Sequence, residues 1–225
     1  MKPDIPPQTP AETKTETLEG KMQEAVDKLS DVNKALKSEA ASRHVLEAQL
    51  ATATRAEEVA RHAAFHDALT GLPNRALFDD RLEHGLAQAR RHGRALAVMY
   101  IDLDDFKTIN DVHGHDVGDA VLQAMADRLK KHARNADTVS RYGGDEFLYL
   151  LVEAGDDRRI AAIAEKLVNA LRKPVPVSIG ELTINASIGI SIFPKDGTVA
   201  GDLVKSADKA MYEAKQSKSG YAFAP

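Results

Sequence analysis

The stretch RYGGDEFLYLL, residues 141–151, holds two glycines, then two acids, then a run of apolar side chains. The Gly143-Gly144 pair predicts a hairpin turn between strands over 138–142 and 146–152. Asp145 and Glu146 therefore stand directly against a strand that we expect to be buried. Because adjacent carboxylates repel each other and resist burial, the pattern requires a cation beside them.

The segments around this hairpin alternate between the periods of helices and strands. The run ALAVMYI, residues 95–101, is almost continuously apolar, which is typical of a central strand covered on both faces. The other predicted elements are helices at 75–92, 116–133, 157–172 and 200–216 and strands at 95–102, 175–180 and 182–192. The order strand, helix, hairpin, helix, strand predicts an α/β (α+β) fold of ferredoxin-like type with a central, mostly antiparallel sheet.

The first segment of the chain differs in composition from the rest. Four of the first ten residues are proline, and the polar segment AETKTET follows them. Such a segment buries too little apolar surface to order itself, so we expect a disordered tail over residues 1–16.

A heptad pattern then predicts a long helix over residues 17–65. Positions at alternating steps of four and three carry eleven apolar residues out of fourteen: Leu18, Met22, Ala25, Leu29, Val32, Leu36, Glu39, Arg43, Leu46, Leu50, Ala53, Glu57, Ala60 and Ala64. An amphipathic helix packed on its own domain is the alternative, but a helix of about 45 residues extends roughly 70 Å. We therefore expect a coiled-coil homodimer, whose seam is weaker in its second half because of the charged positions.

Composition restricts the class of protein. The chain of 225 residues has no cysteine and a formal net charge of -4, so disulfides, thiolate metal sites and a global attraction to nucleic acid are not expected. The beginning of the chain has no apolar region typical of a signal peptide, and no run is long enough to span a bilayer. We expect a cytoplasmic protein that binds neither membrane nor nucleic acid.

The acids beside the predicted strands can form a metal site. Asp102 follows the predicted central strand, and a neighbouring hairpin would bring Asp145 beside it. With the main-chain carbonyl of Leu103, these groups form an all-oxygen site of the kind that Mg²⁺ or Mn²⁺ prefers. The alternatives are an ordinary hairpin turn and a helix-capping aspartate. His113 and His115 lie in one loop, and no zinc site is evident.

Five motifs in order resemble the GGDEF family of diguanylate cyclases, which have a cyclase or palm-type fold. They are DALTGLPNR, YIDLDDFKTINDVHGHDVGD, RYGGDEF, ASIGIS and ADKAMYEAK, within residues 65–221. The resemblance implies a catalytic domain over residues 66–225. It also implies synthesis of cyclic di-GMP from two GTP molecules, each held by one subunit of a dimer.

Carried over residue by residue, the resemblance implies a metal site at Asp102, Leu103 and Asp145. Glu146 would assist the metal or the attacking 3′-hydroxyl, and these two roles stay open. The implied catalytic set is Asp102, Asp145, Glu146 and Lys107. The implied substrate-binding set is Asn110 and Asp119 for guanine, Phe106 beneath the nucleotide loop, Gly143 and Gly144 for close backbone approach, and Lys215 for phosphate. Plain core packing is the alternative for Phe106, and a solvated lysine in the last helical turn is the alternative for Lys215.

A second site is implied by RNAD, residues 134–137, at the place of the family's inhibitory RxxD motif. An arginine fork and a carboxylate suit the edges of guanine, so we expect Arg134 and Asp137 to bind the product, with Lys166 as a secondary basic contact. A solvated helix end is the alternative.

One departure from the family is visible. Where the family commonly continues into Gly-Arg-Asn, this chain reads AKQSKSGYAF, so Ser219 stands near the customary arginine and Lys218 is the nearest substitute. Two other functions therefore stay open: a receptor for GTP or cyclic di-GMP without catalysis, and a coiled-coil scaffold. No sensor domain is visible in the sequence, so we expect an upstream signalling protein as a further partner.

Overall fold

The structure is a computed structural model that describes residues 10–225, with side chains from residue 18 onward. The chain divides into two compact units, one ending at Ala60 and the other running from Arg61 to Pro225. Each unit is described by itself.

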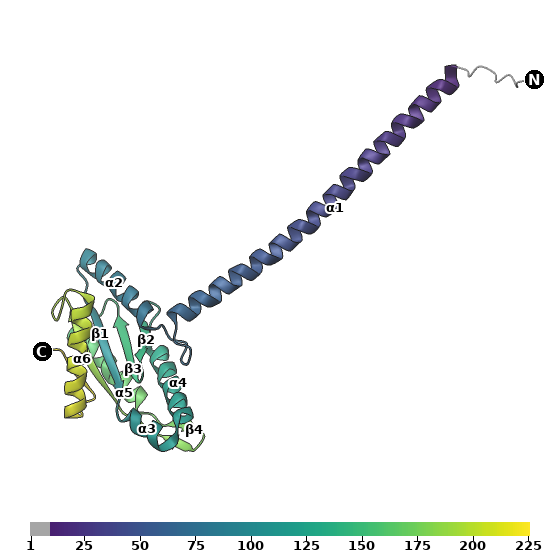
Figure 1. The fold of residues 1–225 in the computed structure, drawn as a ribbon. Coiled ribbons are helices and arrows are strands. Elements are labelled where there is room, and N and C mark those ends of the chain that lie inside the picture. The colour runs from purple at the N-terminus through teal and green to yellow at the C-terminus, as the bar shows by residue number, and fades with distance from the viewer. Residues whose placement is uncertain (1–9) are drawn as a thin grey trace, which may run out of the picture. The chain divides into compact units, whose positions relative to one another are not determined.

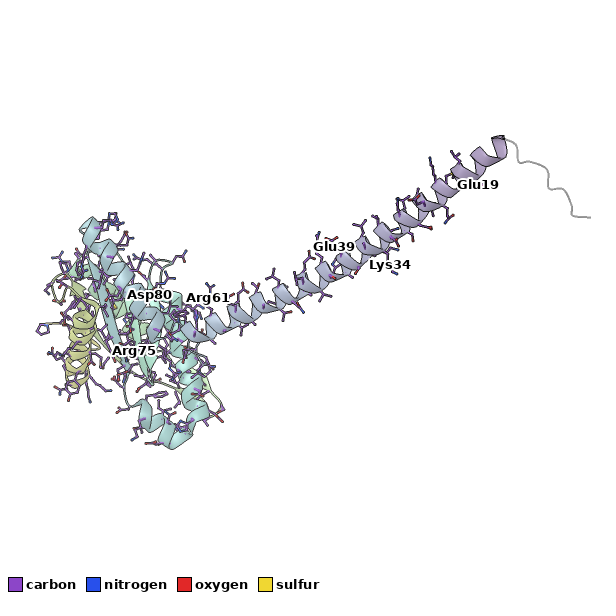
Figure 2. All side chains as sticks on the ribbon, turned by 45° about the horizontal axis from the view of Figure 1, so that its top comes forward. Glu19, Lys34, Glu39, Arg61, Arg75 and Asp80 are labelled. Atoms are coloured by element: carbon purple, nitrogen blue, oxygen red, sulfur yellow. The ribbon has the colours of Figure 1, made fainter. Side chains whose placement is uncertain are left out.

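Helix α1 (Pro10–Phe65) is continuous. The predicted disordered tail falls partly on residues 1–9, outside the described residues, whereas residues 10–16 are helical. The large apolar residues of the predicted seam are all more than half exposed in the single chain: Leu18, Met22, Leu29, Val32, Leu36, Leu46 and Leu50. Glu39, labelled in Figure 2, projects from the helix and interrupts this stripe. Within residues 10–225, no helix carries an apolar stretch that would cross a membrane.

The second unit is built on a five-stranded sheet in the order β2-β3-β1-β6-β7. The strands are β1 (Leu96–Leu103), β2 (Thr138–Gly143), β3 (Glu146–Leu151), β6 (Ala186–Phe193) and β7 (Tyr221–Phe223). Neighbouring strands are antiparallel except β6 and β7, which are parallel. The predicted central, mostly antiparallel sheet is confirmed, and the apolar run at 95–101 forms its middle strand.

Helices cover both faces of the sheet (Figure 1). One face packs against α2 (Arg75–His92) and α6 (Ala200–Ser217), and the other packs against α4 (His115–His132) and α5 (Asp157–Leu171). The two cores meet in β1, where Ala97, Met99 and Ile101 point to one side and Leu96, Val98 and Tyr100 to the other. Asp102, next to the end of β1, is only partly buried, whereas every other residue of the strand is buried.

The structure adds elements that the pattern did not predict. Helix α3 (Phe106–His113) lies where no element was expected; its apolar residues Phe106, Ile109 and Val112 recur at helical spacing, but the helix has only eight residues. The strands predicted at 175–180 and 182–192 are instead a separate hairpin, β4 (Val175–Val177) and β5 (Gly180–Leu182), followed by β6. Gly180, with φ of 124°, starts the second hairpin strand in a conformation that favours glycine. Strand β7 has only three residues, too few to show a period.

Asn74 joins the end of α1 to the start of α2. Its side-chain nitrogen donates to the carbonyl of Ala64 at 2.8 Å, and its side-chain oxygen accepts from the N–H of Leu77 at 3.2 Å. One side chain therefore satisfies an unpaired carbonyl at one helix end and an unpaired N–H at the other. Within the second unit, this side chain holds the last turn of α1 to the first turn of α2.

Gly189 lets α6 lie directly on β6. A Cβ atom at this position would stand 1.9 Å from the carbonyl oxygen of Ala207 and 2.1 Å from the nitrogen of Met211, both backbone atoms. This contact explains the glycine in ASIGIS and sets the height of α6 above the sheet. The position of Lys215 farther along α6 depends on it.

Gly189→Ala is expected to destabilise the fold by about 3 kcal/mol or more, because overpacking against backbone cannot be relieved by a rotamer change. The melting temperature measured by circular dichroism should fall by roughly 10 °C. Gly201→Ala in the same helix is the control, since a Cβ there meets nothing within 4 Å. Equal melting temperatures for the two variants would contradict the assigned packing.

Candidate active site

Two neighbouring strands bring the acids together at one end of the sheet. Asp102 at the end of β1 is the register partner of Glu146, the first residue of β3, and of Ser187 in β6. Asp145 lies in the turn just before β3, and its carbonyl accepts the N–H of Leu103 at 3.4 Å. The hairpin therefore places Asp145 and Glu146 beside Asp102, as the sequence led us to expect.

A lysine supplies the cation that this cluster requires. Lys215 Nζ in α6 donates to Asp102 Oδ1 at 2.5 Å, and the Asp102 side chain is only 14% exposed. Partial burial lowers the pKa of Lys215, but the hydrogen bond to Asp102 and the nearby charges of Asp104 and Asp145 outweigh it and raise the pKa. Lys215 is therefore fully charged at neutral pH and belongs to the carboxylate cluster.

The lysine does not compensate all of the acids. Burial raises the pKa of Asp145, and the charge of Asp102 raises it further. Burial also raises the pKa of Glu146, as do the charges of Asp102 and Asp145, although a hydrogen bond with Tyr100 opposes the shift. The pKa of Asp104 is raised by burial as well. The site holds more negative charge than one ammonium can balance, so it can accept a further cation.

The donors in this cluster suit a hard metal ion. They are carboxylate oxygens and main-chain oxygen, the ligands that Mg²⁺ and Mn²⁺ prefer. Across residues 10–225, no group of three or more acidic, histidine or cysteine side chains is arranged to hold a metal by itself. Mg²⁺ commonly binds through one or two carboxylates and completes its coordination with substrate phosphates and water.

Arg141 holds the glycine turn in place. Its Nε and Nη2 donate to the carbonyl of Gly144 at 2.9 and 2.8 Å, and its Nη1 donates to the two carboxylate oxygens of Asp67 at 3.1 and 3.2 Å. Gly144 has φ of 51°, a conformation that favours glycine. Burial raises the pKa of Asp67, but hydrogen bonds from Thr70 and Arg141 outweigh it and lower the pKa, which keeps the pair charged.

Sequence reasoning missed the Asp67–Arg141 pair. The two residues are separated by 74 positions, and both lie inside motifs that were singled out for other reasons. The opposite charges in DALTGLPNR and RYGGDEF were the available signal, but nothing in the sequence showed that the two motifs meet.

Helices α3 and α4 bring the expected guanine-binding residues near each other. Gly118 lies so close to Asn110 that a Cβ on Gly118 would stand 1.9 Å from Asn110 Oδ1, and 3.2 Å from the ring of Phe106. Asp119, the next residue, is exposed in the second turn of α4, and Phe106 is buried in the core. Lys107 is exposed in the first turn of α3, and Gly143 is exposed in the hairpin.

The residues of the expected product site line a second cavity. Arg134 and Asp137 lie with Arg81, His84 and Lys130 around a volume of about 710 Å³, within the roughly 300–1,000 Å³ typical of ligand pockets. Lys166 lies on α5 and is not among the residues that line this cavity. The structure therefore brings two of the three expected residues together.

Asp137 also has a structural role. Its carboxylate accepts hydrogen bonds from the N–H of Arg134 at 3.1 Å, the hydroxyl of Tyr149 at 3.0 Å and the N–H of Val152 at 3.3 Å. Arg134, in contrast, is exposed. Any ligand of this cavity must therefore share Asp137 with the backbone that surrounds it.

Comparison with known proteins agrees with this geometry. Residues 64–220 match the family model described as "Diguanylate cyclase, GGDEF domain". The bifunctional diguanylate cyclase/cyclic di-GMP phosphodiesterase MucR of Pseudomonas aeruginosa is 48% identical over 161 residues, which are 71% of this chain and 23% of MucR. The chain thus spans less than a quarter of the length of that relative.

Two solved structures extend the likeness toward α1. The coiled coil and GGDEF domain of DgcB from Caulobacter crescentus, in complex with c-di-GMP, has a TM-score of 0.69 and 28% identity, and covers 80% of this chain and 99% of that one. Diguanylate cyclase SiaD from Pseudomonas aeruginosa, in complex with its activator SiaC, has a TM-score of 0.64 and 29% identity, and covers 92% of this chain and 86% of that one. The family match covers most of the chain and contains every residue of the acidic cluster, so this protein belongs to the GGDEF family of diguanylate cyclases.

Proposed function

We propose that this chain synthesises cyclic di-GMP, condensing two GTP molecules with release of two pyrophosphates. The observation that carries this proposal is the partly buried cluster of Asp102, Asp145 and Glu146, which Lys215 only partly neutralises. A charge deficit of this kind suits a site that binds a metal together with a nucleotide.

The substrate is recognised by two kinds of group. Asn110 and Asp119 read guanine, because its N1–H and N2–H₂ are donors that a carboxylate accepts, whereas adenine leaves that carboxylate without a partner. Phe106 supports the loop from below, and Gly143 and Gly144 let the backbone approach the nucleotide.

The metal ligands are Asp102, Asp145 and the Leu103 carbonyl. Mg²⁺ or Mn²⁺, when bound, offsets charge on the phosphate oxygens. The ammonium group of Lys215 would turn from Asp102 toward the phosphates of the bound GTP. Lys107 would add a second positive charge there.

The reaction joins two half-sites. The 3′-oxygen of one GTP bonds to the α-phosphorus of the other, the bond to pyrophosphate breaks, and the same exchange in the opposite direction closes the ring. Glu146, which is hydrogen-bonded to Tyr100, would accept the proton of the 3′-hydroxyl as the new bond forms. Each subunit supplies one GTP, so a single domain is not sufficient.

A parallel coiled-coil homodimer of α1 supplies the second domain. The apolar stripe of α1 is exposed in the single chain, and a second copy would bury it. The weaker seam from Glu39 to Glu57 allows an upstream signalling protein to bias how the half-sites meet. Among the similar proteins, SiaD is described in complex with an activator, which supports control of this kind.

The experiment that tests the function is incubation of purified chain, cleared of bound product, with GTP and Mg²⁺, followed by chromatographic detection of cyclic di-GMP. We expect product from the parent chain and none above background from Asp145→Asn. ATP in place of GTP should give no cyclic dinucleotide.

Product inhibition at Arg134 and Asp137 is the proposed control of the enzyme. Arg134→Ala is the better probe, because Asp137 is also needed for three hydrogen bonds within the fold. A guanidinium that grips a base edge contributes about 1–3 kcal/mol, so the cyclic di-GMP concentration for half-inhibition should rise about tenfold or more. Initial rates measured without added product should match the parent.

Lys131→Ala is the control for that measurement. Lys131 is exposed in the last turn of α4, three residues before Arg134, and does not line the cavity. If Arg134→Ala were inhibited by product as strongly as Lys131→Ala, the inhibitory site would have to lie elsewhere.

A receptor without catalysis is the second candidate, and the residue at position 219 favours it. Ser219 Oγ lies 2.9 Å from the carbonyl of Tyr221 and 3.1 Å from Ser217 Oγ, so it is engaged in its own turn. It does not replace the arginine that the family commonly has here. A parent chain that binds cyclic di-GMP but makes none would support the receptor.

A further inference from the structure

A polar cavity borders Lys215, and no residue of the glycine hairpin lines it. Its volume is about 360 Å³, many times the roughly 30 Å³ that one water occupies in the liquid. Three cations line it, with two acids and several neutral residues: Arg172, Lys215, Lys218, Asp104, Asp105, Asn185, Ala186, Ser187 and Gly220. The cavity is therefore large enough for a chain of phosphates.

Arg172 enters this cavity from a distant part of the sequence. It is the C-terminal cap of α5, and its Nε donates to Asn185 Oδ1 at 3.1 Å. Within residues 10–225, its two terminal nitrogens have no protein acceptor, and it forms no ion pair. One edge of the guanidinium is thus anchored, and the other edge is available to an anion.

The segment that presents Arg172 is held firmly. Arg128 in α4 donates to the carbonyls of Leu171, Lys173 and Pro174 at 2.9, 2.5 and 2.7 Å, on both sides of Arg172. Burial lowers the pKa of Arg128, which is the expected cost of placing a guanidinium among carbonyls. Arg172 is therefore displayed by a fixed turn.

Lys218 also lines the cavity. It caps α6 in the left-handed conformation, with φ of 53°, a position where glycine is the usual residue. It forms no ion pair with any residue that the structure describes. A lysine kept in a conformation that favours glycine, beside two other cations, is unexpected if its only role is to end a helix.

The acids of the cavity are partly occupied. Asp104 Oδ1 accepts the hydroxyl of Ser187 at 2.9 Å, whereas Asp105 is the N-cap residue of α3 and its exposed side chain makes no capping hydrogen bond. Lys215 lines the cavity, but its ammonium is hydrogen-bonded to Asp102, which does not line it. Arg172 and Lys218 are therefore the cations that remain to attract an anionic ligand.

We infer that Arg172 and Lys218 bind the polyphosphate tail of GTP and together replace the arginine that is missing at Ser219. The inference rests on the proposed function, because it assigns residues that bind the phosphate end of the same substrate, GTP. It also accounts for how this chain keeps its affinity for GTP without the family's usual residue.

The test uses the full chain and measures binding of GTP, GMP and inorganic tripolyphosphate by titration calorimetry in the presence of Mg²⁺. Arg172→Met and Lys218→Met should each weaken GTP binding about fivefold to tenfold, and the double variant more, because each removes a charge-assisted contact. GMP binding should be unchanged, since GMP does not reach the cavity. Tripolyphosphate binding should weaken in parallel with GTP.

Two controls keep the result specific. Lys173→Met removes an exposed charge next to Arg172 that does not line the cavity, and it should bind GTP as the parent does. Adding Lys218→Gly and Ser219→Arg to the Arg172→Met chain rebuilds the family's Gly-Arg pair and should restore GTP binding. Thermal melting confirms that each variant is folded.

The outcomes separate this inference from the proposed function. If the parent binds GTP and makes product but Arg172→Met and Lys218→Met bind GTP equally well, the inference is overturned and the cyclase stands. If the parent binds tripolyphosphate through Arg172 but makes no cyclic di-GMP, the cavity is a phosphate site and the cyclase is lost.

Discussion

Asp145→Asn is expected to lower the rate of cyclic di-GMP synthesis by at least about a thousandfold, which corresponds to roughly 4 kcal/mol of transition-state stabilisation. The substitution keeps the shape of the side chain and removes the charge that offsets the metal. Asp102 and the Leu103 carbonyl remain, but two such groups hold Mg²⁺ poorly.

The same variant should be no less stable than the parent when metal is absent. The pKa of Asp145 is raised in the fold, mainly by burial. The folded state therefore holds this proton more tightly than the unfolded state, and ionisation at neutral pH opposes folding. A neutral asparagine removes that opposition, so the melting temperature in EDTA should be equal or higher.

If Asp145→Asn lost activity and also melted at a lower temperature than the parent, misfolding would explain the lost activity better than loss of the metal. Asp127→Asn, an exposed acid on α4, is the matched control and should change neither quantity. Substantial synthesis by Asp145→Asn with either Mg²⁺ or Mn²⁺ would refute the assigned metal ligand.

Removal of residues 1–60 is expected to have the second large effect. The compact unit from Arg61 onward retains the whole site, but its partner then arrives only by diffusion. A short tether gives an effective concentration on the order of millimolar, so activity per chain at micromolar protein should fall about a hundredfold or more. The rate should also become second order in protein concentration, which a dilution series measures directly.

A pair of neighbouring substitutions tests the seam without truncation. Leu46 lies on the predicted heptad seam and Val45 lies beside it, and both are more than half exposed in the single chain. Leu46→Glu should weaken the dimer in analytical ultracentrifugation and reduce activity with it, whereas Val45→Glu should keep both. If truncation left activity per chain independent of dilution, α1 would not be what brings the half-sites together.

The sequence predicted the sheet well because its buried strands are unambiguous. The run at 95–101 has apolar residues on both faces, and only a central strand uses such a run. The two glycines fixed the hairpin, and the hairpin placed Asp145 and Glu146 beside Asp102. Helix α3 could not be predicted in the same way, because one buried residue, Phe106, does not define a period.

The contacts that hold the site in place were harder to predict from the sequence. Arg128 donates to main-chain carbonyls, Arg141 to the Asp67 carboxylate and Arg172 to the Asn185 side-chain amide, and each acceptor is supplied by another segment of the fold. No local pattern marks an arginine whose acceptors are carbonyls, since every residue has one. Lys166, which the family resemblance suggested as a secondary contact of the product site, does not line the cavity of Arg134 in the single chain, so its role stays a prediction.

The bridge between Arg141 and Asp67 has a practical consequence for protein engineering. Asp67 follows the end of α1 at Phe65 by two residues, and through Arg141 it is connected to the carbonyl of Gly144. A foreign sensor module joined anywhere before Asp67 would leave this connection whole. A junction placed after Thr70 would remove Asp67 and leave the glycine turn without this anchor. Chimaeras joined before Asp67 should therefore change their activity in response to the sensor's signal, and those joined after Thr70 should not.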